Sequence, residues 1–175
     1  MLVFEFKADL NMFLAELTDS TVRTLADVIA FNSTHAEEEL KYFGQELLLQ
    51  TEATTSLDDP VYLAAIEETH RLSRQEGIDA VMDQYNLDAL VMPTNSPPWP
   101  VDLINGDPSL GSSSQPAALA GYPAISLLAG YVFGLPVGIT FMGRAFSEPT
   151  LIKLAYAFEQ GTKVRRSPRY LSTMP

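Results

Sequence analysis

The sequence predicts an α/β protein with a partial, mixed sheet flanked by helices. The main observation behind this prediction is the run Ala117–Gly143, which carries no charged residue although 19% of the chain is charged. Pro123 and Pro136 would break a membrane-spanning helix there. The short apolar stretches Ala124–Ala129 and Val137–Met142 lie between turn signals and predict strands buried on both faces. The glycines at 130, 134 and 138 then mark turns.

The N-terminal part predicts four helices. Apolar spacing indicates the first over Lys7–Leu17, and Ser20 or Thr21 is the expected cap of the second. Two short helices follow over Ala36–Phe43 and Glu46–Glu52. The residues expected on the apolar sides of the first two helices are Leu10, Phe13, Leu14, Leu17, Val22, Leu25, Val28 and Ile29.

A long helical segment should begin at Asp59-Pro60, a cap followed by proline at the first helical position. It should run to about Asn86 with a bend at Gly77. The apolar residues expected to face the core are Leu63, Ile66, Ile78, Val81, Met82 and Tyr85.

Three core strands are expected, over 88–92, 124–128 and 137–142. Pro93–Gln115 reads as a long loop, and loops of this length are often functional. Pro116–Ala120 predicts a short helix. Ser147 should cap a final helix that ends at Gly161, with the apolar stripe Leu151, Leu154, Ala155 and Phe158.

Composition favours one domain spanning residues 1–175 and a cytoplasmic location. The absence of cysteine excludes disulfides and thiolate chemistry, and the net charge of −11 disfavours nucleic acid and anionic membranes as partners. The basic residues Lys163, Arg165, Arg166 and Arg169 form a tail that is expected to be solvated, or else docked on the chain's own acidic surface or on a missing partner segment.

Several motifs together resemble the C-terminal part of the amidase signature family, from about Glu5 to Pro168. They are Tyr42-Phe43-Gly44-Gln45-Glu46, Leu87–Thr94, Gly121-Tyr122-Pro123-Ala124, Gly134-Leu135-Pro136-Val137-Gly138, Phe141-Met142-Gly143 and Leu151–Glu159. The likeness extends to amidases of the aminohexanoate cyclic dimer hydrolase type. It implies carboxamide hydrolysis on a small-molecule amide without a cofactor.

The resemblance also implies a Ser–Ser–Lys mechanism whose serine and lysine segments precede the part represented here. None of Lys7, Lys41, Lys153 and Lys163 matches the catalytic motif, so no catalytic residue is assigned. We therefore expect a C-terminal fragment that is inactive alone. The alternative is a non-catalytic scaffold or subunit that keeps half of an amidase fold.

Other candidate chemistry is weaker. Gly111-Ser112-Ser113-Ser114 resembles a nucleophile segment, but a polar loop before a short helix explains it better. Glu67 and His70 lie one helical turn apart, yet without further ligands they predict no metal site.

The expected substrate-binding residues are Asn95, Trp99, Ser112, Ser113 and Ser114. The serines and the asparagine offer hydrogen bonds to an uncharged amide, while Trp99 either walls a pocket or pins the loop to the core. An exposed sheet edge also predicts a homo-oligomer.

Overall fold

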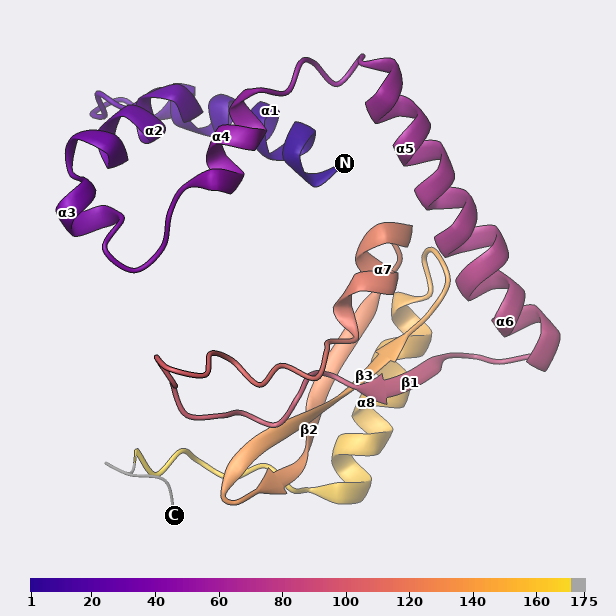
Figure 1. Ribbon diagram of the computed structural model, residues 1–175. Helices are drawn as coiled ribbons and strands as arrows, with labels where there is room; N and C mark the ends of the chain where they lie inside the picture. The colour runs from indigo at the N-terminus through magenta and orange to yellow at the C-terminus, as the bar shows by residue number, and fades with distance from the viewer. Residues whose placement is uncertain (171–175) are drawn as a thin grey trace. The chain divides into compact units, whose positions relative to one another are not determined.

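A computed structural model describes residues 1–170 (Figure 1). The chain divides into two compact units, Met1–Glu68 and a second that begins at Thr69. The single-domain expectation stays a prediction. Among the described residues, no helix is both long enough and apolar enough to cross a bilayer.

The first unit is helical. Its helices are α1 (Leu2–Glu16), α2 (Leu25–Thr34), α3 (Ala36–Glu39), α4 (Glu46–Glu52) and the start of α5 (Pro60–His70). Lys7 joins α1 to the end of α4: its Nζ donates to the carbonyl oxygens of Glu52 at 2.6 Å and Thr54 at 3.0 Å. Phe4 packs against the ring of Tyr62.

The expected cap of α2 was wrong. Thr24 caps it through a reciprocal capping box with Asp27, while Ser20 bonds the backbone of Val22. The sequence carries this signal, because an acid three residues after a threonine can return a bond to the cap backbone. Phe13, expected on the buried side of α1, is 59% exposed.

The predicted long helix is one continuous segment of α5, a π-helical stretch η1 (Arg71–Ile78) and α6 (Asp79–Tyr85). The bend at Gly77 is confirmed, with φ −109° and ψ −105°. Of the residues expected to face the core, Ile78 and Met82 are buried and Ile66 is half-buried. Leu63, Val81 and Tyr85 are exposed, and Tyr62 is buried instead.

The sheet has the order β1-β3-β2, with β1 (Leu90–Pro93), β2 (Ala124–Val132) and β3 (Leu135–Met142). The α/β class is confirmed. The sheet was expected to be mixed, whereas every strand pair among the described residues is antiparallel. β2 and β3 form a hairpin whose turn residues Phe133 and Gly134 both have positive φ, as a tight primed turn requires.

Only one of the three glycines assigned to turns lies in one. Gly134 is in the hairpin turn, whereas Gly130 lies at a register shift of β2 and Gly138 lies within β3. Gly138 is required for close approach, because a Cβ there would meet Thr94 Oγ1 at 2.5 Å.

Helices pack on both faces of the sheet. α8 (Glu148–Thr162) contacts β2 and β3, and its Phe158 meets Phe141 edge-on at 6.0 Å. The adjacent Met142 points to the opposite face. There it joins a cluster with Ile78, Met82 and α7 (Ser114–Ala120), which contributes Ala117 and Ala120.

The predicted apolar stripe of α8 is confirmed, although the helix runs past Gly161 to Thr162. Full burial of the strands was wrong for both, since no residue of β2 is buried and in β3 only Thr140–Met142 are buried. The absence of charged residues in a segment indicates that the segment avoids water, but it does not indicate how fully each face of the strand is covered.

Candidate functional site

The long loop after β1 begins and ends at the same place. Asn95 forms a bridge with Ser112, and the carbonyl oxygen of Thr94 accepts from Ser113 N at 3.0 Å and from Ser113 Oγ at 3.1 Å. Thr94 N in turn donates to the carbonyl of Gly138 at 2.9 Å. Thr94 thus fixes both ends of the loop to β3.

A row of hydroxyls continues from this junction into the sheet. Thr94 Oγ1 lies 2.8 Å from Thr140 Oγ1, which lies 2.8 Å from Ser126 Oγ. Thr140 is only 2% exposed, so its hydroxyl depends on these two partners. Sequence reasoning missed these residues, since only the strand register brings the hydroxyls together.

The three candidate serines differ in their surroundings. Ser113 is buried and both its N–H and its hydroxyl bond Thr94. Ser112 and Ser114 are exposed, with their Oγ atoms 3.1 Å apart. Within residues 1–170, no lysine or histidine is hydrogen-bonded to these hydroxyls. The arrangement offers hydrogen bonds but holds no base beside a serine.

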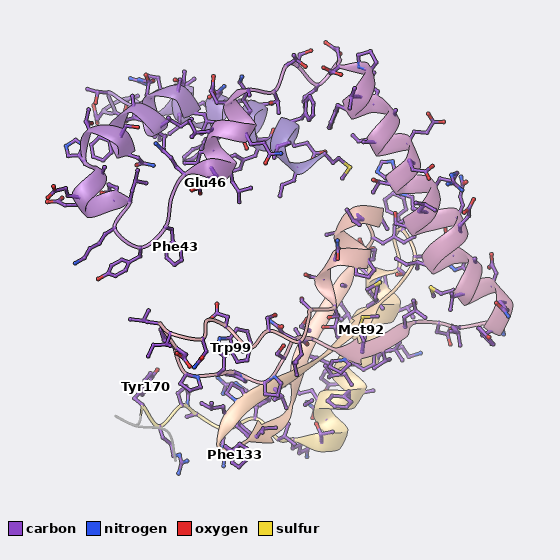
Figure 2. The ribbon with its side chains drawn as sticks, in the orientation of Figure 1. Phe43, Glu46, Met92, Trp99, Phe133 and Tyr170 are labelled. Carbon is purple, nitrogen blue, oxygen red and sulfur yellow. The ribbon has the colours of Figure 1, made fainter. Side chains whose placement is uncertain are left out.

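Trp99 bonds another part of its own loop and lines a groove, while its expected roles as a substrate wall or as a tie to the core stay predictions. Its indole Nε1 donates to Asp107 Oδ1 at 2.9 Å, which pins one part of the loop to another. Its side chain also lines a groove of about 450 Å³ together with Asn95, Pro136 and Gly138. Figure 2 shows Trp99 within this loop region. Asn95 and Trp99 therefore share one groove, while the serines lie at the junction.

The tip of the loop is ordered by Asp102. Its carboxylate accepts from the backbone N–H groups of Asn105 and Ile104 and from the Asn105 side chain. These bonds hold the pKa of Asp102 below its usual value, and the bond from the Asn105 backbone N–H is the largest cause. The turn leaves the apolar side chains of Leu103 and Ile104 exposed.

The histidines have structural contacts. His70 Nε2 lies 3.0 Å from Arg74 Nη2, and His35 stacks on Phe31. No group of three metal-ligating side chains occurs in the described part of the chain.

Comparison with known proteins gives the family. The model of the Amidase family matches residues 1–152. A probable amidase from Arabidopsis thaliana is 41% identical over 98% of this chain and 30% of its own length. The native peptide amidase of Stenotrophomonas maltophilia is 46% identical with a TM-score of 0.86, over 98% of this chain and 34% of that one.

A more distant solved structure has the same fold. An amidase family protein from Bacillus anthracis is 31% identical with a TM-score of 0.73, over 96% of this chain and 30% of that one. The chain thus spans about a third of the length of these relatives. None of them tests the likeness to aminohexanoate-type amidases, which stays a prediction. The family match and the shared fold together show that this chain belongs to the amidase family.

Proposed function

We propose that the protein hydrolyses the carbon–nitrogen bond of carboxamides, and that these 175 residues supply a substrate-facing wall rather than the nucleophile. The observation that carries the proposal is the 46% identity to a peptide amidase along 98% of the chain. Amides of peptides are therefore the substrates to try first. The cytoplasm remains the predicted location.

The wall consists of the groove beside Trp99 and the junction beside it. Asn95, Ser112 and Ser114 are exposed and offer uncharged donors and acceptors, which suit a neutral amide. Ser113 is buried and does not face the groove, but its bonds to Thr94 hold the junction in place.

The same geometry argues against hydrolysis by these residues alone. A serine hydroxyl is a weak nucleophile without an adjacent base. The serines here bond one another and Thr94 rather than a lysine or histidine. We expect no ammonia release from N-acetyl dipeptide amides by the purified 175-residue chain. Turnover that disappears in the Ser112→Ala, Ser113→Ala, Ser114→Ala triple variant would overturn this part of the proposal.

A chimera tests the rest. This chain would replace the segment that it matches in the Stenotrophomonas maltophilia peptide amidase, and the unaltered enzyme is the control. We expect the chimera to release ammonia from peptide amides. A chimera that folds, by circular dichroism and melting temperature, but has no activity would support the alternative of a non-catalytic scaffold.

Two substitutions in the active chimera separate the roles of Trp99. Trp99→Phe keeps an aromatic wall but loses the bond to Asp107, whereas Trp99→Ala loses both. If the ring is a wall, KM should rise about fivefold to tenfold in Trp99→Ala and less than about twofold in Trp99→Phe, because substrate-binding contacts act on KM. Equal increases would assign Trp99 to loop anchoring alone.

A further inference from the structure

Asn105 is the one asparagine of the chain that a glycine follows. Asparagine is a thermolabile residue, because the nitrogen of the next peptide bond can attack its side-chain amide. A glycine at the next position has no side chain to hinder that attack. Both residues are exposed at the tip of the loop 93–115, and a Cβ at Gly106 would meet nothing within 4 Å. The dipeptide and its open surroundings therefore favour chemical change at Asn105.

Asp102 holds both of the groups that this reaction needs. Its Oδ2 accepts at 2.8 Å from Asn105 Nδ2, the nitrogen that would leave. Its carbonyl oxygen accepts at 3.0 Å from Gly106 N, the nitrogen that would attack. Its Oδ1 accepts from Asn105 N at 3.0 Å, so the backbone beside the two groups is held as well. Asn105 can therefore react only when this turn opens.

We propose that Asn105 is a site of spontaneous deamidation, and that its bonds to Asp102 set the rate. In the first step Gly106 N loses its proton and bonds to Asn105 Cγ, while the Cγ–Nδ2 bond breaks and the side-chain nitrogen leaves as ammonia. Water then adds to either carbonyl of the cyclic imide and opens the ring, which leaves aspartate or isoaspartate at position 105. In sum, one water is consumed and one ammonia is released, with no oxidant or reductant. The inference does not depend on amide hydrolysis by the candidate site.

Either product would disrupt the turn at the loop tip. A carboxylate at position 105 would replace the amide that donates to Asp102 Oδ2, so that two like charges would face each other. Isoaspartate would also add a carbon to the backbone before Gly106, which displaces Gly106 N from the carbonyl of Asp102. The next residue, Asp107, accepts from Trp99 Nε1 at 2.9 Å. Deamidation should therefore change the surroundings of Trp99 and of the groove that it lines.

The test incubates the purified full chain at mildly alkaline pH and follows its peptides by mass spectrometry, with isoaspartate identified by fragmentation. We expect Asn105 to convert to an acid while the other asparagines keep their amides. Asp102→Ala should convert at least about fivefold faster, because the bonds that oppose opening of the turn are lost. Asp88→Ala is the matched control, since it removes the same charge at an exposed position outside the loop, and its rate should differ less than about twofold from that of the wild type.

Two further measurements separate the site from its restraint. The chain unfolded in urea lacks the turn and should convert at least about fivefold faster than the folded chain. Asp102→Asn keeps an acceptor oxygen without the charge and should convert at an intermediate rate, because hydrogen bonds to a charged group are stronger. Equal rates in the wild type and both Asp102 variants would overturn the restraint. An unchanged Asn105 in Asp102→Ala, after the unfolded chain has converted, would overturn the site.

Trp99 reports whether the change reaches the groove, since it is the only tryptophan of the chain. We expect its fluorescence to change with the same half-time as the conversion of Asn105. In Asn105→Gln the fluorescence should stay constant over that period, because the longer side chain closes an imide ring far more slowly. Unchanged fluorescence in a fully converted sample would overturn the link between Asn105 and the groove.

Discussion

Thr94 is the residue on which the candidate site depends most directly. Its side chain bonds the buried Thr140 and its backbone holds both ends of the long loop. Thr94→Val keeps the shape but removes the hydroxyl, leaving Thr140 with Ser126 alone. We expect the free energy of unfolding, measured with urea, to fall by about 1–2 kcal/mol. Thr94→Ser keeps the hydroxyl and should lose less; a Thr94→Val variant as stable as the wild type would show that the hydroxyl bond to Thr140 contributes nothing measurable.

Asp27 makes the helical unit sensitive to acid. Its carboxylate accepts from the backbone N–H groups of Arg23 and Thr24, each at 2.9 Å, and the Arg23 bond is the main cause that lowers the pKa of Asp27. The folded pKa lies below the unfolded value of 3.8. The charged cap therefore contributes stability above pH 3.8, which is lost as pH falls through the folded pKa.

The test compares melting temperatures of the wild type and Asp27→Asn. Asp27→Asn should melt lower at neutral pH, and the difference should shrink as the pH falls below 3.8. Glu38→Gln, at an exposed position of α3, is the control and should not show this convergence. A difference that is constant with pH would contradict the charged-cap account.

At the scale of elements, two glycines should respond oppositely to the same substitution. A Cβ at Gly77 would lie 2.6 Å from the carbonyl oxygen of Leu72, whereas at Gly161 in α8 nothing lies within 4 Å. Gly77→Ala should destabilise the chain by about 1–3 kcal/mol through overpacking. Gly161→Ala should stabilise it by about 0.5–1 kcal/mol, because alanine loses less backbone entropy in a helix. Chemical denaturation measures both; a neutral Gly77→Ala would show that the π-helical bend relaxes easily.

The sequence predicted the positions of helices and strands better than it predicted which of their side chains are buried. Glu46–Glu52, the start at Pro60 and the bend at Gly77 depend on local signals, and the structure has each of them. Exposure depends on neighbours far along the chain, which explains why Phe13 and Leu63 were placed wrongly. For the same reason the loop was identified as a candidate site, but the bonds of Thr94 to Thr140 and Ser113 were not. Strand register and loop closure decide which residues Thr94 bonds, and no short sequence pattern predicts either of them.

At the scale of the whole molecule, self-association through the sheet edge stays a prediction, and α1 offers a second surface. Leu2, Phe6 and Phe13 are 76%, 41% and 59% exposed. Their spacing places them on one face of the helix. An exposed apolar stripe of this kind favours association with a like stripe on another chain. We therefore expect light scattering to report an oligomer of this 19.2 kDa chain at high protein concentration.

Phe6→Glu with Phe13→Glu should convert that oligomer to a monomer, because two charges on each chain would face each other across a symmetric contact. Ala15→Glu, at an exposed position on the opposite side of the same helix, is the control and should leave the assembly in place, because its added charge lies away from the stripe. Circular dichroism must show that both variants keep their helices. If the double variant remains an oligomer, the contact does not run through the α1 stripe, and the sheet edge is the surface to test next. A monomer of the unaltered chain would contradict both surfaces, and would mean that charge repulsion from a net charge of −11 outweighs the attraction of the exposed apolar side chains.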